Sequence, residues 1–503
     1  MTVKKKLLLN TMVSLVNQLL TIVCGFILPR FFLLYYGSKV NGLISSITQF
    51  LGFITLAELG VGAVVQSALY KPLAEKNNEE ISKIIKSSER FFKKIAIILL
   101  IYSGILMIVY PTIINNNFSY FYTASLIFAI SISSFVQYFF SISYRLLLNA
   151  DQLAFIQVGV QTISLVLNTI MCIILMKLGM EVQLVKLATS IIFLIQPIYI
   201  TYYVKKHYHL DRNIEYEDEP VKQKWNGMAQ HVAAVVLNNT DTIVLTLFST
   251  LENVSIYAVY FLVVNGVKSL FLSLTNGFQS LMGELWAKQR IDKLKVLFSW
   301  VEWSMHTLSI IVFGCTASLI LPFVSVYTKG IQDANYLVPE FAVLITIAFA
   351  GPCIRLPYYL MILAAGHYKQ TQANHIWAAV INIIISVAFV KKFGLIGVAI
   401  GTICAMFYQT FWMAYYNSKQ LIKWPIKSFL KQMLTDCLTG VIAYTVCKLF
   451  SMKCNNYFEW IVLAVKIFAV WIIVVFVINM ICYREKMVNI LKIVKSKIAR
   501  KMK

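Results

Sequence analysis

The sequence predicts an all-α polytopic membrane protein with about fourteen transmembrane helices. Of its 503 residues, 59% are hydrophobic and only 13% are charged, and the mean hydropathy is +0.72. Apolar runs of about 20 residues, long enough to cross a bilayer as a helix, recur from one end of the chain to the other. Tyrosine and tryptophan gather at the ends of these runs, as expected at the membrane interface. A large soluble core would need amphipathic helices, and most of these segments have no polar face.

Each span can be placed in order along the chain. The first follows the basic stretch MTVKKK, is too long for a cleavable signal peptide and lacks a small-residue cleavage site. The second is followed by a basic stretch, 71–94, in which isoleucines interleave with the charges, so we expect part of it on the membrane surface. The predicted spans are approximately residues 7–34, 41–70, 95–114, 120–144, 153–176, 184–204, 227–250, 254–282, 297–321, 338–364, 373–390, 395–416, 433–450 and 460–481.

Basic residues indicate the orientation of these spans. Most of the 45 lysines and arginines fall in alternate loops, which predicts that both termini are cytoplasmic. The net charge of +23 therefore reflects topology, and since there is no soluble basic domain we expect no nucleic-acid partner. The nine cysteines are scattered through apolar runs without a CxxC pair. We interpret them as small hydrophobic residues and expect no metal site.

The connection after the sixth span mixes both signs of charge more densely than any other and contains the acidic patch EYEDE. We interpret it as the joint between two halves. The predicted organisation is a six-helix half over 1–204, a cytoplasmic charged linker over 205–226, a second six-helix half over 227–417, and two extra helices with a basic cytoplasmic tail over 418–503.

An internal repeat supports this division. The stretch LLLNADQLAFIQVGVQTISLVLNTIMCIILMKLG, which ends at Gly179, resembles MILAAGHYKQTQANHIWAAVINIIISVAFVKKFG, which ends at Gly394. The match aligns the fifth span with the eleventh. Because the shift is an even number of spans, we expect parallel repeats related by an axis along the membrane normal.

The seventh span, within WNGMAQHVAAVVLNNTDTIVLTLF, carries a carboxylate near its centre. Asp241 shares one helical stripe with Gln230, Ala234 and Asn238. A charge at this depth usually faces a bundle interior or a wet cavity. Two interpretations stay open: a core carboxylate that ties helices together by hydrogen bonds, and the polar wall of a transport path.

Five ionisable residues are singled out inside the predicted spans: Arg30, Glu58, Asp241, Lys268 and Arg355. Each costs about 2.5–3.5 kcal/mol at the bilayer centre even on a lenient scale. Cations that converge on a cavity would suit an anionic head group such as phosphate or pyrophosphate. The alternatives are that Arg30 snorkels outward from a helix end and that a carboxylate pairs with one of the cations.

These residues define two candidate sites. The candidate substrate-binding residues are Arg30, Lys268 and Arg355, with Asn265 and Gln279 on the face of Lys268. The candidate ion-coupling residues, for a proton or a sodium ion, are Glu58, Asp241 and Asn238.

Three stretches carry a family resemblance: PRFFLLYYGSKVNGLISSITQFLGFITLAELGVGAVVQSALYKPLAEKN near the start, LLNADQ after the fourth span, and VLNNTDTIVLTLF in the seventh. With the layout of six, six and two helices, they make the chain resemble the Wzx-type polysaccharide or O-antigen flippases of the multidrug/oligosaccharidyl-lipid/polysaccharide exporter superfamily. The resemblance implies alternating-access export of an undecaprenyl-pyrophosphate-linked oligosaccharide across a bacterial cell membrane. It also suggests membrane lipids and polysaccharide polymerase machinery as partners.

Two other classes of function are open. A multidrug exporter of the same superfamily would not need cations in its cavity. A membrane glycosyltransferase or oligosaccharide polymerase would need carboxylates and usually a sizeable outer loop, but the longest outer connection, 322–337, has only Asp333 as an acid. The sequence shows no metal-ligand cluster, Gly-rich phosphate loop or nucleophile triad. We therefore expect no enzymatic activity and no cofactor.

Overall fold

The structure, a computed structural model, describes most of the chain. The described residues are 3–58, 61–114, 118–211, 213–216, 218–220, 228–273, 276–450 and 453–501. All of them lie in helices or in the connections between helices, with no strand, which confirms the predicted all-α polytopic class. Eleven of the described helices are long and apolar enough to cross a membrane by length and composition.

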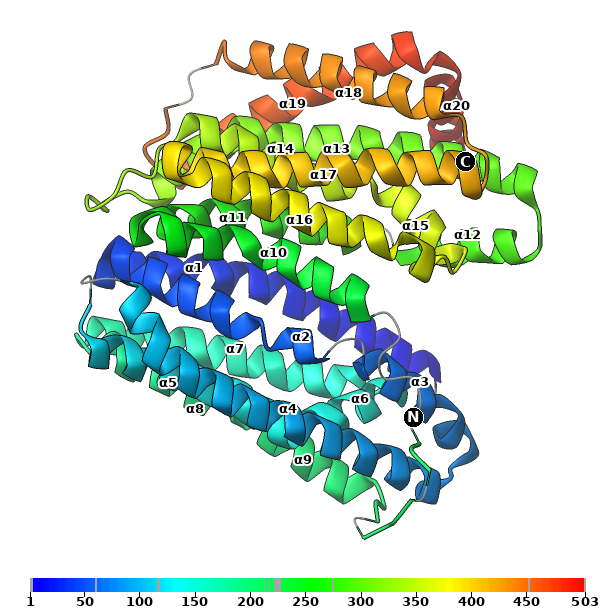
Figure 1. The fold of residues 1–503 in the computed structure, drawn as a ribbon. Coiled ribbons are helices and arrows are strands. Elements are labelled where there is room, and N and C mark those ends of the chain that lie inside the picture. The colour runs from blue at the N-terminus through cyan, green and yellow to red at the C-terminus, as the bar shows by residue number, and fades with distance from the viewer. Residues whose placement is uncertain are drawn as a thin grey trace. The chain divides into compact units, whose positions relative to one another are not determined.

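The helices group into two compact units (Figure 1). The first unit runs to Ala258 and includes Gly330–Ala334; the second holds Val259–Lys329 and the chain from Asn335 on. The helices of the first unit are α1 (Val3–Gly52), α2 (Thr55–Glu58), α3 (Val61–Glu75), α4 (Asn78–Ile113), α5 (Tyr120–Val136), the π-helix η1 (Gln137–Ser141), α6 (Ile142–Ala150), α7 (Ala154–Lys177), α8 (Val182–Phe193), α9 (Ile195–His207), α10 (Met228–Phe248) and the start of α11 (Leu251–Ser273). Those of the second are the rest of α11, α12 (Asn276–Ala287), α13 (Ile291–Tyr327), α14 (Pro339–Ile354), α15 (Leu356–Ala364), α16 (Tyr368–Phe393), α17 (Leu395–Gln420), α18 (Ile426–Cys447), α19 (Tyr457–Cys482) and α20 (Arg484–Lys501).

The repeat predicted from the sequence is visible in the helix bounds. Helices α6 and α15 have nine residues each, and a three-residue turn leads from them into α7 and α16. That turn has a residue with positive φ at Gln152 in one copy and at Gly366 in the other, and Gly179 and Gly394 have positive φ after α7 and α16. The packing repeats as well: α4 contacts α5, α5 contacts α8 and α7 contacts α8, as α13 contacts α14, α14 contacts α17 and α16 contacts α17. The predicted division into halves at 205–226 stays a prediction. The two compact units are divided at another place, because α10 belongs to the first unit.

A break at Gly37 divides α1 into the first predicted span and the start of the second. Gly37 has φ 80° and ψ 176°, and a Cβ there would lie 2.7 Å from Oδ2 of Asp333. The helix resumes at Ser38, whose N–H and hydroxyl both donate to the carboxylate of Asp333, each at 2.6 Å. Asp333 thus acts as the N-cap of the second part of α1, supplied from a distant segment.

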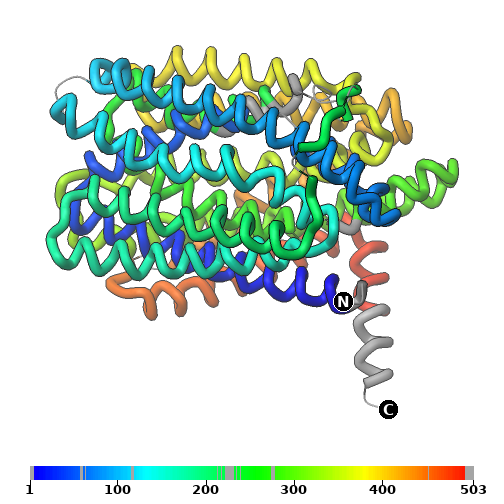
Figure 2. The backbone as a smooth tube through the Cα atoms, turned by 90° about the horizontal axis from the view of Figure 1, so that it is seen from below, coloured from blue at the N-terminus to red at the C-terminus, as the bar shows by residue number. Residues whose placement is uncertain are grey.

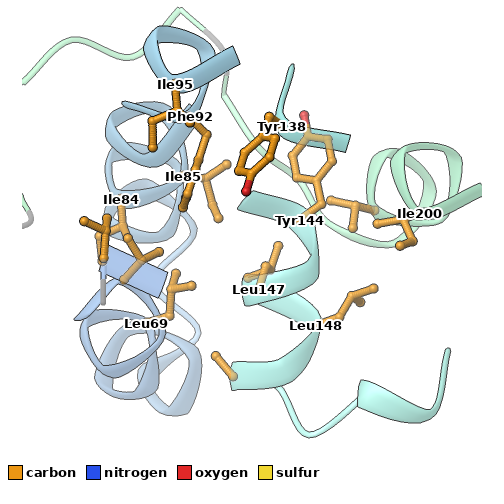
Figure 3. Packing of buried hydrophobic residues seen from close by; sticks show 14 of the residues in the cluster. Leu69, Ile84, Ile85, Phe92, Ile95, Tyr138, Tyr144, Leu147, Leu148 and Ile200 are labelled. Atoms are coloured by element: carbon orange, nitrogen blue, oxygen red, sulfur yellow. The ribbon is translucent and has the colours of Figure 1, made fainter. Parts of the chain in front are cut away.

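The start of α4 packs into the first unit, where the apolar side chains of the 71–94 stretch face other helices. The expected position of part of this stretch on the membrane surface stays a prediction. Ile81, Ile84, Ile85 and Phe92 are all at most 3% exposed and pack with α3, α6 and α9. Figure 3 shows Ile85 and Phe92 on the side of α4 that faces Tyr144 and Leu147 of α6. The spacing of these isoleucines suits both a bilayer surface and a groove between helices, and in the folded protein they pack into the groove.

Asp151, in the LLNADQ turn, joins three segments of the first unit. Its Oδ1 lies 2.9 Å from Nζ of Lys6, and its Oδ2 accepts a hydrogen bond from the hydroxyl of Tyr208 at 2.5 Å. The linker continues along α4, where Nζ of Lys86 donates to the carbonyl of Ile214 at 2.5 Å. One ion pair and two hydrogen bonds thus connect α1, the turn after α6, α4 and the linker at this end of the unit.

The second unit is arranged around α13, which contacts α14, α15, α18 and α19. The side chains of Ile467, Trp471 and Val475 on α19 form a buried cluster with residues of α18 and α13. After α19 the backbone turns at Tyr483 into α20 (Figure 2). Helices α18 and α19 are thus docked on α13 by apolar packing.

Candidate functional site

Two cations of the second unit interact electrostatically. Lys268 lies on α11, and Arg355 lies at the junction where α14 ends and α15 begins. Pro352 and Pro357 flank this junction, and since neither has a backbone N–H they favour the interruption. Arg355 exerts a Coulombic effect on Lys268. The helix break thus brings a guanidinium into the electrostatic range of an ammonium on another helix.

The contacts of these two cations are weak for charged groups. Nζ of Lys268 lies 4.9 Å from the ring centroid of Phe349, and Nη1 of Arg355 donates to the thioether of Met406 at 3.0 Å. A thioether is a weak acceptor, and a cation on an aromatic face gains about 0.5–2 kcal/mol. Within the described part of the chain, no carboxylate forms an ion pair with either cation. The site is therefore left with positive charge and free donor capacity.

His375, which the sequence analysis does not single out, borders this site from α16. Its Nδ1 lies 3.1 Å from Nε2 of Gln409, its ring meets that of Tyr359 edge-on at 6.2 Å, and Arg355 acts on it electrostatically. Because an amide nitrogen can only donate, Nδ1 is the acceptor and the imidazole carries its proton on Nε2. The sequence feature that could have identified His375 is its position as an ionisable residue inside the eleventh predicted span.

The predicted groove along Lys268 is only partly supported. Asn265 lies on α11 with Lys268, and both are half-buried. Helix α11 is described to Ser273 and α12 from Asn276. Residues 274–275 between them lie outside the described part of the structure, so the predicted single helix to residue 282 and the face shared by Lys268 and Gln279 stay predictions.

Asp241 is buried, at 5% exposure, and belongs to the first unit. Its Oδ2 accepts a hydrogen bond from the hydroxyl of Tyr257 at 2.9 Å, which links α10 to α11. The hydrogen-bonding interpretation made from the sequence therefore has a direct partner in the structure. A role of this buried carboxylate in ion binding stays open as a proposal.

A polar seam joins α1 to the hairpin of α10 and α11 within the first unit. Asn41 donates to Ser255 at 2.8 Å, and Ser46 and Thr246 share a hydrogen bond of 2.7 Å. A Cβ on Gly42 would lie 1.9 Å from the carbonyl oxygen of Leu251. The backbones therefore approach so closely there that only glycine fits.

The remaining predicted site residues, Arg30, Glu58 and Asn238, belong to the first unit. Arg30 is half-buried on α1 of the first unit. Glu58 ends α2 and Asn238 lies on α10, and their side chains lie outside the described part of the structure. The structure thus places Lys268 and Arg355 in one unit, and the ion-coupling candidates in the other.

No protein-family model matches this chain, and no curated protein matches its sequence. Solved structures do match its fold. The lipid II flippase MurJ, in an inward closed conformation, has a TM-score of 0.68 at 17% identity over 95% of this chain and 100% of that one. An inward-facing multidrug resistance MATE family transporter of the MOP superfamily has a TM-score of 0.62 at 15% identity over 80% and 94%.

A third match is a MOP superfamily transporter from Pyrococcus furiosus, with a TM-score of 0.50 at 14% identity over 84% of this chain and 95% of that one. The reverse polarity of its binding pocket is described as suggesting a different function for that protein. At these identities the likeness concerns the fold. The chain has the fold shared by the lipid II flippase MurJ and the MATE transporters of the MOP superfamily.

Proposed function

We propose that this protein is a flippase that moves an undecaprenyl-pyrophosphate-linked oligosaccharide from the inner to the outer leaflet of a bacterial cell membrane. Alternating access would carry the substrate, and an ion gradient would drive the cycle. The fold supports a transporter, and the Wzx-type resemblance of the sequence supports the lipid-linked glycan.

One observation carries the choice of substrate: Lys268 and Arg355 interact in the second unit without a carboxylate paired to either one among the described residues. Cations inside a membrane protein are costly and usually pair with an anion. A pyrophosphate supplies several oxygens, which suit both the fork of a guanidinium and the point charge of an ammonium. A multidrug exporter would gain nothing from this arrangement.

The proposed energy coupling uses residues of the first unit. Asp241 is buried and bonded to Tyr257, so binding of a proton or sodium ion would change the charge of a group that links α10 and α11. Glu58 and Asn238 are further candidates on grounds of sequence alone.

Reconstituted vesicles that contain an undecaprenyl-pyrophosphate-linked oligosaccharide test the proposal. We expect Lys268→Gln to abolish most translocation and Lys268→Arg to retain part of it, because a guanidinium keeps the charge. Lys186→Gln is the matched control, since Nζ of Lys186 also lies over an aromatic ring, 4.2 Å from the centroid of Phe32, but in the first unit. Full translocation by Lys268→Gln, or transport by the wild type of cationic drugs instead of the lipid, would overturn the proposal.

A further inference from the structure

A second group of buried ionisable residues lies where α13 meets the last helices of the second unit. Glu302 and His306 are one turn apart on α13 and are 4% and 0% exposed. His306 Nδ1 lies 2.6 Å from Oδ2 of Asp436 on α18, which is 6% exposed. Nε2 of Gln432 donates to the other oxygen of Asp436 at 3.2 Å. The pair joins two helices at a buried position.

Glu302 is well supplied with hydrogen-bond donors. It accepts from the hydroxyl of Tyr358 on α15 at 2.5 Å and from Nε1 of Trp424, which lies 3.0 Å from each of its oxygens. The ring of Tyr358 also meets that of His306 edge-on at 6.4 Å. The carboxylate of Glu302 is thereby fixed beside the imidazole.

His306 Nε2, in contrast, is buried and has no hydrogen-bond partner in the described structure. When Nδ1 of a neutral imidazole donates to Asp436, its Nε2 carries a lone pair that can accept a hydrogen bond or a proton. Two buried carboxylates, Asp436 and Glu302, then face a neutral ring. One further proton on Nε2 would change the summed charge of the two carboxylates and the imidazole from two negatives to one. Nothing else in the group offers a vacant acceptor of this kind.

Two further titratable residues act electrostatically on this group. Tyr483 acts on Tyr358, and Lys486 acts on Glu302. Nζ of Lys486 is held by the carbonyl of Ser299 at 2.7 Å, and Nζ of Lys431 by the carbonyl of Cys482 at 3.0 Å. Both lysines thus donate to backbone oxygens, and neither forms a hydrogen bond to Asp436 or Glu302 among the described residues.

We infer that His306, hydrogen-bonded to Asp436 and flanked by Glu302, is a proton-binding site of this protein. Sodium fits less well, because it takes oxygen ligands and the vacant atom is an imidazole nitrogen. Histidine is also the side chain whose charge ordinarily changes between pH 5 and 8. The proton would convert the His306–Asp436 hydrogen bond into an ion pair and so strengthen the attachment of α18 to α13. This inference does not rest on the proposed substrate.

The imidazole nitrogen resonances of the full chain in nanodiscs, labelled with ¹⁵N-histidine, provide the test. The chain has six histidines, so the signal that His306→Gln removes identifies His306. We expect this signal to show uptake of a proton on Nε2 as the pH is lowered in the wild type. Asp436→Asn should weaken proton binding by about tenfold or more, since it deletes one of the two carboxylates. His367→Gln is the control, because His367 of the same unit pairs with the neutral hydroxyl of Tyr416, and it should leave the titration of His306 unchanged.

The inference fails if the His306 signal keeps one protonation state at every pH at which the protein stays folded, which would make the pair a fixed structural contact. The wild-type titration decides this point even if the Asp436 variant does not fold, and Glu302→Gln supplies a second variant with the same expected direction. If the wild type moves no lipid-linked substrate while His306 still titrates, the proposed function is wrong and the proton site stands.

Discussion

The carboxylate of Asp333 accepts hydrogen bonds from both the N–H and the hydroxyl of Ser38, at 2.6 Å each. The two residues are 295 positions apart, and the contact caps the part of α1 that resumes after the break at Gly37. We expect Asp333→Ala to destabilise the protein by about 1 kcal/mol, the usual cost of a lost N-cap. Asp333→Asn should retain most of the stability, because asparagine caps about as well as aspartate. Thermal unfolding in detergent measures the difference; equal midpoints for wild type and Asp333→Ala would contradict the capping role.

Arg355 tests the geometry of the proposed anion site. Replacing it by Lys keeps the charge but removes the planar fork, so we expect an intermediate rate of translocation. Arg355→Gln should lose roughly ten- to a hundredfold, corresponding to about 1.5–3 kcal/mol for a hydrogen bond to a charged group. Initial rates in vesicles, at equal protein content, provide the comparison. Identical rates for the Lys and Gln variants would show that the charge at this position plays no part.

Asp241 tests energy coupling. Asp241→Asn keeps the shape and the hydrogen-bonding capacity of the side chain but removes its charge. We expect the variant to insert normally and to lose the part of translocation that depends on an imposed ion gradient. Tyr257→Phe is the companion change, because it removes the 2.9 Å hydrogen bond and keeps the carboxylate. Normal export by Asp241→Asn at every pH would leave Asp241 as a structural residue.

Lys486 gives the stability of the fold a pH dependence. Burial lowers its pKa to about 8, although Glu302 acts in the opposite direction. A lysine whose folded-state pKa lies below its ordinary value of 10.5 destabilises the fold while it is charged in both states. The cost is fully present below about pH 8 and is relieved as the pH rises from there toward 10.5, because the unfolded chain then holds more protons.

Stability from this residue should therefore increase with pH over that window, by at most about 1.4 kcal/mol per pH unit for one proton. Unfolding midpoints from tryptophan fluorescence between pH 7 and 10 should rise less steeply in Lys486→Met than in wild type. Lys492→Met, at an exposed position of the same helix, is the control and should keep the wild-type slope. A slope unchanged in Lys486→Met would show that this lysine is not buried in the native state.

The predicted orientation can be tested by labelling. Single cysteines at the exposed positions Asp218 and Lys453, in a chain without its nine natural cysteines, should react from opposite sides of the membrane. Position 218 lies in the predicted cytoplasmic linker, and position 453 lies in the connection between the last two predicted spans. Access of a membrane-impermeant reagent to 453 but not to 218 in intact cells is the expected result. The reverse pattern would overturn the assignment of both termini to the cytoplasm.

The sequence by itself determined the membrane class, the approximate spans and the repeat. These features depend on hydropathy over about 20 residues and on local turn chemistry, both of which are written in consecutive positions. Gly394, for example, marks the end of α16 in the repeated stretch and adopts positive φ there. Lys268 and Arg355 could be singled out for a similar reason, since a charge within an apolar run is visible without knowledge of its neighbours.

Tertiary structure alone decided which distant groups meet. Nothing in the local sequence pairs His306 with Asp436, 130 positions away, or places Asp333 at the broken end of a helix near the N-terminus. The isoleucines before residue 95 are equally suited to a bilayer surface and to the groove that they fill in the first unit. Hydrophobic burial is non-directional, so a pattern of apolar residues specifies that a face is covered but not by what. The covering partner depends on how all the helices pack together, and it is this packing that places each buried charge beside its neighbours.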